Sequence, residues 1–140
     1  MRVLLLLTLI FLMPAPANAQ ELSAQGAQDL AAEDAVLLID VRHPQEWRQT
    51  GVPRGAQTVS IHDPGGLPAF LAKVRALADQ SPDRPIALIC ATGVRSSFAA
   101  NLLREEGYDQ VFDVSEGMLG SSAGAGWLKQ NLPVRSCREC

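Results

Sequence analysis

Residues 86–97 read IALICATGVRSS and hold the most informative pattern in the chain. The apolar run 86–89 is typical of a short buried strand, and it ends on Cys90. A loop of small residues follows, and a helical pattern begins directly after it at Val94. In an open α/β sheet, ligands bind beyond the carboxyl ends of the strands. The stretch therefore predicts that Cys90 lies where such a sheet carries its chemistry.

Cys90 is predicted to be an activated nucleophile. Backbone N–H groups of the loop and the N-terminus of the following helix both stabilise an anion, which favours a thiolate. Gly93 permits the tight curvature of the loop, and Arg95 adds a permanent positive charge. The alternative is an inert core cysteine. Such a residue seldom opens a glycine-containing strand-to-helix turn that is followed by Arg.

Outward from this stretch, the chain alternates between strand and helix patterns. Brief apolar runs bounded by Gly, Pro or charged residues predict buried strands, and these lie at 36–41, 58–61, 86–90 and 111–114. Apolar residues at helical spacing predict helices, and these lie at 67–77, 94–106, more weakly at 23–32, and for one or two turns at 44–49. Strands that alternate with helices imply crossover connections. We therefore expect an α/β fold with a mostly parallel sheet of four or five strands and helices on both faces.

The first 19 residues have the layout of a secretory signal peptide. Arg2 gives a positive start, an apolar stretch runs from Val3 to Met13, and small residues follow at 17–19. Eleven residues of helix span only about 16 Å, which is roughly half of a hydrocarbon core and argues against a membrane anchor. The sequence predicts cleavage before Gln20 and export, to the periplasm if the source is a Gram-negative bacterium. One domain is expected over 20–140.

The composition excludes several classes of protein. The chain has 140 residues, 47% of them apolar, with 12 basic and 15 acidic residues and a net charge of −3. That length suits one domain. A mildly acidic chain without a basic run is a poor candidate for binding nucleic acid. The same composition argues against a disordered chain and against a disulfide-dense miniprotein.

Several stretches together resemble a single-domain rhodanese. They occur in the order that the family shows and are LIDVR at 38–42, Glu46-Trp47, Gly51, Gly55-Ala56, CATGVRS at 90–96, GYDQV at 107–111, Glu116-Gly117, Trp127 and LPV at 132–134. The resemblance covers a core from about residue 35 to residue 134. A Cys-x-x-Cys tail at 135–140 follows it.

The resemblance implies a five-stranded, largely parallel sheet and sulfurtransferase chemistry through a cysteine persulfide. Cys90 would attack the outer sulfur of thiosulfate or a similar anionic donor, and sulfite would leave. The sulfur would then pass to cyanide, a thiol or a protein thiol partner. Cys90 and Arg95 are the expected catalytic residues. Substrate binding is expected at Ala91, Thr92, Gly93 and Val94, and no metal or organic cofactor is implied.

Asp40 and Arg42 close the first strong strand at the same sheet edge as Cys90. Arg42 is a candidate ligand for the oxyanion of the donor. The interpretation that we favour is structural: an ion pair or hydrogen bonds that fix the neighbouring loops, with Asp40 in support.

Cys137 and Cys140 leave three hypotheses open. The simplest is an inert disulfide, because exported thiols tend to pair. The second is a redox pair that accepts the sulfur of Cys90 or resolves it as a disulfide. The third is a metal site, which would need further ligands, and His43 and His62 are the only histidines.

Two functional alternatives also stay open. One is a non-catalytic binding module or a thiol redox module that uses the tail cysteines. The other is a phosphatase or arsenate reductase, whose loops resemble a Cys-x5-Arg spacing, whereas four residues separate Cys90 from Arg95 here. The glycine-rich residues 117–126 are longer than the family pattern, and we interpret them as a surface insertion rather than a mobile loop near the site.

Overall fold

The computed structural model describes residues 20–140. The predicted signal peptide at 1–19 lies outside the described residues. Within 20–140, none of the helices has the length and apolar character needed to cross a membrane.

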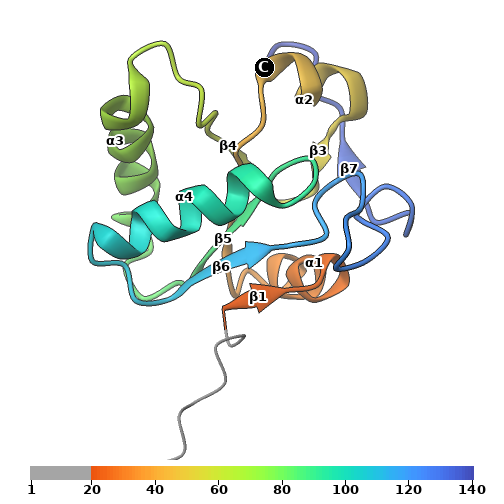
Figure 1. Cartoon of the computed structure of the whole chain (residues 1–140), viewed down its shortest axis with the longest axis horizontal. Coiled ribbons are helices and arrows are strands. Elements are labelled where there is room, and N and C mark those ends of the chain that lie inside the picture. The colour runs from red at the N-terminus through yellow and green to blue at the C-terminus, as the bar shows by residue number, and fades with distance from the viewer. Residues whose placement is uncertain (1–19) are drawn as a thin grey trace, which may run out of the picture.

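A five-stranded parallel sheet forms the centre of the molecule (Figure 1). In spatial order its strands are β1 (Glu21–Leu22), β6 (Val111–Val114), β5 (Ile86–Ile89), β2 (Leu37–Asp40) and β4 (Gln57–Thr58). The predicted α/β fold with a mostly parallel sheet is confirmed. The strand at the β1 edge was not predicted.

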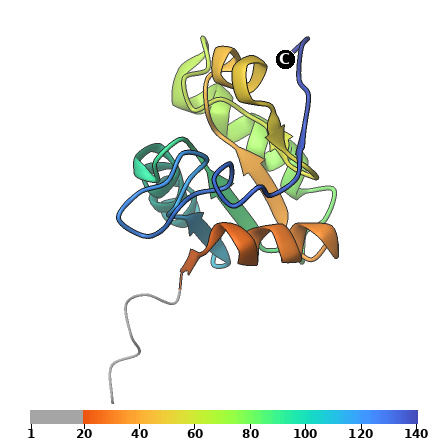
Figure 2. The ribbon, with the colours of Figure 1, turned by 90° about the vertical axis from the view of Figure 1, so that its right-hand side faces the viewer.

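Within residues 20–140, four helices cover the two faces of this sheet. They are α1 (Ala24–Ala32), α2 (Pro44–Thr50), α3 (Gly66–Ala78) and α4 (Val94–Glu105). All four begin and end within two residues of their predicted positions. The helices α3 and α4 pack on one face and α1 packs on the other (Figure 2).

Each face of the sheet buries its own hydrophobic cluster. The side chains of β5 point alternately to the two faces, and this alternation decides which cluster each side chain joins. Leu88 and Cys90 belong to the cluster under α3 and α4. Ala87 and Ile89 belong to the cluster on the α1 side, together with Trp127. Side chains alternate between faces because successive residues of a strand point in opposite directions. Cys90 therefore faces α4.

A second, two-stranded sheet ties the end of the chain to the segment after α2. Its strands β3 (Val52–Pro53) and β7 (Val134–Arg135) pair antiparallel. The Trp127 indole N–H donates to the Pro133 carbonyl at 3.1 Å and fixes the approach to β7. Strands of two residues carry no periodicity, so the sequence did not predict this sheet.

Candidate active site

Cys90 follows β5 directly and is buried, with 1% of its surface exposed. Its sulfur accepts a hydrogen bond from the Gly93 N–H at 3.2 Å and one from the Ser96 hydroxyl at 3.3 Å. The thiol is free, and α4 begins four residues later at Val94. Two donors and a helix N-terminus therefore surround one sulfur atom, and all of them favour negative charge on it.

Residues 90–95, here called the cysteine loop, turn sharply at Gly93. Gly93 has φ +89°, and a Cβ atom there would lie 2.4 Å from the Ser115 carbonyl oxygen. Only glycine fits such a position without displacing the opposite backbone. Of the predicted substrate-binding residues, Gly93 is the one whose N–H reaches the sulfur. Ala91 is half-buried, whereas Thr92 and Val94 are exposed at the rim of the loop.

Residues 115–119, here called the supporting segment, hold the cysteine loop from the other side. The Met118 N–H donates to the Cys90 carbonyl and the Leu119 N–H to the Ala91 carbonyl, both at 2.9 Å. Gly117 lies so close that a Cβ there would be 2.4 Å from the Ala91 oxygen. The prediction of a surface insertion at 117–126 is wrong in this respect, because its first residues form part of the wall of the site.

The guanidinium of Arg95 is hydrogen-bonded to a residue of α2 and is not free. Its guanidinium donates to both carboxylate oxygens of Glu46, at 2.7 and 2.8 Å. The hydrogen bond from Arg95 is the main cause that lowers the pKa of Glu46 from 4.5 to about 2, and the His43 N–H adds to it. The same pairing raises the pKa of Arg95. The Arg95 guanidinium remains near the sulfur, but its N–H groups are directed at Glu46. The pair therefore links the cysteine loop to α2.

Arg42 is buried and has a structural role; it is not a ligand for a bound anion. Its guanidinium is 1% exposed and donates to both Asp40 carboxylate oxygens. Further hydrogen bonds reach the Thr50 hydroxyl and the Gly51 carbonyl, each at 2.8 Å. The assignment of Arg42 to substrate binding is therefore corrected. Asp40 and Arg42 instead join the end of β2 to the end of α2, as the structural interpretation described.

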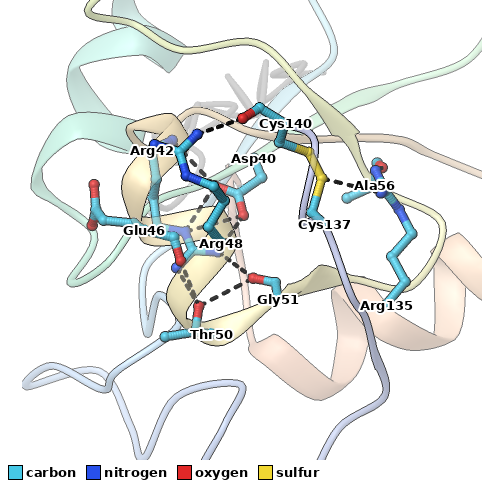
Figure 3. Close-up of a disulfide and its surroundings, with 10 residues drawn as sticks. All are labelled: Asp40, Arg42, Glu46, Arg48, Thr50, Gly51, Ala56, Arg135, Cys137 and Cys140. Atoms are coloured by element: carbon cyan, nitrogen blue, oxygen red, sulfur yellow. Dashed lines mark hydrogen bonds and ion pairs between the residues drawn. A yellow bond between two sulfur atoms is a disulfide. The ribbon is translucent and has the colours of Figure 1, made fainter.

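The tail cysteines form a disulfide with each other, Cys137 to Cys140 (Figure 3). Cys137 is buried in the cluster on the α1 side, whereas Cys90 belongs to the opposite cluster. The Arg48 side chain of α2 donates to the Cys140 carbonyl and holds the end of the chain there. The sheet separates the tail sulfurs from Cys90, and the geometry does not bring them together.

Three polar residues near the site were not assigned a role from the sequence. Ser96 belonged to the recognised motif and donates to Cys90. Asp113 is a buried carboxyl on β6. Glu116 accepts from the backbone N–H groups of Ala24 and Gly126, both at 3.0 Å. For Asp113, the available signal was a charged residue inside the short apolar run 111–114, because burying such a residue without partners is unfavourable.

His43 and His62 stack their rings at the N-terminal end of α2. The ring centroids are 4.1 Å apart and the planes differ by 8°. Both side chains are exposed. The pKa of His62 is lowered, first by partial burial and then by the neighbouring His43 and Arg95. Within the described residues, no group of three or more potential ligands is placed to hold a metal.

Comparisons with known proteins give a consistent result. The family model described as Rhodanese-like domain matches residues 23–123. A sulfurtransferase of Allochromatium vinosum is 30% identical over 108 residues, which are 77% of this chain and 86% of the relative. An uncharacterized protein of Rickettsia prowazekii is 29% identical over 106 residues, which are 74% of this chain and 86% of the relative.

The fold is also similar to solved structures. The crystal structure of Rv0390 from M. tuberculosis superimposes with a TM-score of 0.63 and 29% sequence identity. The match covers 86% of this chain and 100% of that one.

Proposed function

Because the chain belongs to the rhodanese-like domain family, we propose that it is a sulfurtransferase that carries a sulfane sulfur as a persulfide on Cys90. One observation carries the proposal: a free, buried thiol accepts hydrogen bonds from Gly93 and Ser96 at the N-terminus of α4. Such surroundings favour the thiolate, which is the nucleophilic form of cysteine. The relative from A. vinosum that is named a sulfurtransferase supports the same chemistry.

In the first half of the reaction, the Cys90 thiolate attacks the outer sulfur of thiosulfate or a similar donor. A new S–S bond forms on Cys90, the S–S bond of the donor breaks, and sulfite leaves with that electron pair. One S–S bond replaces another and the electrons balance between the two reactants, so the step needs no outside oxidant or reductant. The Gly93 N–H and the positive end of α4 are placed to stabilise the charge on the persulfide.

In the second half, an acceptor attacks the terminal sulfur of the persulfide. With cyanide, a C–S bond forms, the S–S bond breaks, and thiocyanate leaves while Cys90 returns to the thiolate. A thiol acceptor, whether small or on a protein, would react at the same sulfur. The sulfur donor and acceptor are therefore proposed as an anionic sulfur compound and a nucleophile.

Arg95 is proposed to support this chemistry through the position of the loop. Glu46 occupies its guanidinium through two hydrogen bonds, and a bidentate pair of this kind fixes direction as well as distance. The pair links the first turn of α4 to the first turn of α2. Its proposed function is to keep Gly93 and Ser96 in reach of the sulfur.

Export of the protein is proposed from residues 1–19 alone, whose charged start, apolar stretch and small residues follow the signal-peptide pattern. Fractionation of cells followed by N-terminal sequencing tests this. Mature protein that begins at Gln20 outside the cytoplasm is the expected result. Uncleaved protein in the cytoplasm would contradict export.

The enzymatic proposal is tested by mass spectrometry of the protein after incubation with thiosulfate. We expect the addition of one sulfur atom on Cys90, its removal by cyanide, and no addition in Cys90→Ala. The double variant Cys137→Ser/Cys140→Ser is the matched control and should gain the same sulfur. A protein that gains none but hydrolyses an aryl phosphate would instead belong with the phosphatases.

A further inference from the structure

A solvent-facing cavity beside the cysteine loop is not used by the proposed sulfur transfer. It has a volume of about 410 Å³ and lies between the start of α4 and the turn at 121–123. Cys90 does not line it. Hydroxyl and carboxyl side chains make up most of its lining, and they include Glu21, Thr92, Asp113, Ser115, Ser121 and Ser122.

Two carboxyl groups of this cavity come from paired positions on adjacent strands. Glu21 of β1 is paired with Asp113 of β6 in the parallel register (Figure 1). Adjacent strands lie about 4.8 Å apart, and paired residues of parallel strands point to the same face. Val111, two residues before Asp113, packs in the cluster under α4, so both carboxyl groups lie on that face. Two negative charges therefore meet at one edge of the sheet.

Asp113 is buried and has an oxygen without a partner. Its side chain is 7% exposed, and its Oδ1 accepts no hydrogen bond from residues 20–140. The hydroxyl of Ser115 is likewise buried without a partner in this part of the chain. Buried polar atoms without partners are unfavourable. Both residues line the cavity, so a ligand bound there can satisfy them.

The chain does not supply a paired cation for these carboxyl groups from α4. Arg104 acts on Asp113 through its charge alone, because its terminal nitrogens donate to Asn101 and to the Val111 carbonyl, each at 2.8 Å. Burial raises the pKa of Asp113, and the charge of Glu21 raises it further. A cation bound between the two carboxyl groups would oppose both effects.

The number and kind of acceptors select among possible ligands. An ordered water satisfies unpartnered oxygens but brings no charge. Ca²⁺ takes six to eight oxygen ligands, whereas no group of three or more potential ligands within residues 20–140 is placed to hold a metal. An ammonium group carries one positive charge and three N–H donors. That count matches the buried carboxyl of Asp113, the free hydroxyl of Ser115 and the exposed carboxyl of Glu21.

We propose that this cavity binds a small organic molecule through a primary ammonium group, with Asp113 as its main partner. Ser115 accepts a second N–H, and Glu21 adds negative charge at the opening. The volume exceeds that of one ammonium group, so the ligand carries a short body beyond it. Val94 and Ala123 line the same cavity and offer that body apolar contact.

The wall of the cavity is fixed by hydrogen bonds within the chain. The Ser121 hydroxyl donates to the Ser115 carbonyl at 2.8 Å, and the Ala123 N–H donates to the Ser121 hydroxyl at 3.0 Å. Thr92 and Gly93 of the cysteine loop form part of the opposite wall. The ligand would therefore contact the cysteine loop from outside, without occupying the position of the sulfur donor.

The proposal is tested by NMR titration of the protein with n-butylammonium chloride at neutral pH. We expect saturable shifts at the backbone amides of Ser115, Ser121 and Ser122 in the unmodified protein. Asp113→Asn keeps the shape of the side chain and should weaken binding about tenfold or more, because a hydrogen bond to a charged group contributes that much. Unchanged affinity in Asp113→Asn would overturn the assignment.

Two further variants separate the site from general charge. Glu21→Gln should weaken binding less, about two- to fivefold, because Glu21 is exposed. Glu105→Gln is the matched control: it removes an exposed carboxylate of α4 that does not line the cavity, and it should bind with unchanged affinity. An equal loss in Glu21→Gln and Glu105→Gln would mean that only the net charge attracts the amine.

Two comparisons use the unmodified protein alone. Tetramethylammonium has the same charge but no N–H donor, so it should not produce the shifts. Shifts that grow in proportion to the amine without saturating, or that tetramethylammonium reproduces, would overturn the proposal. Saturation by calcium chloride at lower concentration than the amine would replace the ammonium site by a metal site. The titration contains no sulfur donor, so its outcome is independent of the persulfide assay.

Discussion

At Gly93 two backbone segments lie so close together that only a hydrogen atom fits in place of a side chain. The clash of a Cβ with the Ser115 carbonyl oxygen, at 2.4 Å, adds to the strain of a positive φ. The N–H of the same residue donates to the Cys90 sulfur. A single position thus fixes both the shape of the cysteine loop and one of the donors that stabilise its anion.

We predict that Gly93→Ala lowers the free energy of unfolding by about 1–3 kcal/mol and removes most sulfur transfer. The methyl group forces the loop away from Ser115, and the N–H leaves the sulfur. Gly107→Ala is the matched control, because Gly107 has φ +96° but no atom within 4 Å of the position that a Cβ would take. Gly107→Ala should lose stability but keep its sulfur-transfer activity. Urea unfolding and a transfer assay separate the two effects, and equal loss of activity in both variants would contradict the prediction.

The Arg95–Glu46 pair predicts a dependence of stability on pH. The folded-state pKa of Glu46, about 2, is lower than its ordinary value of 4.5. Its contribution is therefore fully present above pH 4.5 and is lost as the pH falls toward about 2. We expect Glu46→Gln to lower the free energy of unfolding at neutral pH by about 1 kcal/mol, since the pair is partly solvated.

The difference between the unmodified protein and Glu46→Gln should disappear as the pH falls, in denaturation curves measured over that range. Asp34→Asn breaks another bidentate pair, with Arg84, which precedes the start of β5, whereas the cysteine loop follows the end of that strand. It should leave sulfur transfer unchanged, whereas Glu46→Gln should reduce it. A loss in Glu46→Gln that stayed constant at every pH would count against the assigned ionisation.

Single residues also show how far sequence reasoning reaches. The position of Cys90 after a strand and before a helix followed from local pattern, because strand and helix periodicity extend over several residues. The partners of Arg42 and Arg95 did not follow, because Thr50, Gly51 and Glu46 approach them from another element. A sequence identifies an arginine near a site, but tertiary packing decides whether its donors are free.

At the scale of elements, α1 depends on a residue far from it in the chain. The Ala24 N–H at its first turn donates to Glu116, 92 positions later. The other Glu116 oxygen accepts from the Gly126 N–H at 3.0 Å and the Gln130 amide at 2.7 Å. A carboxylate at a helix N-terminus is favourable. Glu116 therefore joins α1 to the segment that also supports the cysteine loop.

We predict that Glu116→Gln destabilises the protein by about 1–3 kcal/mol. An amide presents one acceptor and one donor group, so the Ala24 and Gly126 N–H groups could no longer both be satisfied. Ser23→Ala, which removes the other N-terminal cap of α1 at Gly26, is the control and should cost about 1 kcal/mol. Hydrogen exchange should rise at both Ala24 and Gly126 in Glu116→Gln. A rise at Ala24 alone would mean that the two segments are not coupled.

The elements that sequence reasoning missed are short. All four helices and the strands β2, β5 and β6 have enough residues for a periodic pattern. The strands β1, β3 and β7 have two residues each and exist because a partner strand supplies their hydrogen bonds. Their residues have no local preference that distinguishes them from a loop. Only the assembled sheet determines them.

At the scale of the molecule, the sheet separates the free cysteine from the tail disulfide. Cys90 lies on the α4 side with the Ser96 hydroxyl beside it, and the tail disulfide lies on the other. The disulfide closes a very short loop, three residues from Cys137 to Cys140 in sequence. Such a loop stabilises a protein by about 2 kcal/mol in the chain-entropy model.

We predict that Cys137→Ser/Cys140→Ser unfolds more easily than the unmodified protein, by about 2 kcal/mol or less, and transfers sulfur at the same rate. The reason is that the tail acts on β7 and the end of α2, not on the sulfur of Cys90. Denaturation and steady-state transfer, measured on the same samples, check both parts. A large drop in turnover would revive the sulfur-relay hypothesis for the tail.

The strand order has a consequence for the way the molecule is made. The strand β6 lies between β1 and β5, although β1 is synthesised first and β6 last among the three. A chain that stops before residue 111 has Cys90 and the residues of α4 but lacks the Ser115 carbonyl against which Gly93 packs. The cysteine loop therefore depends on a partner that is synthesised after it, and its final shape requires most of the chain to have been made.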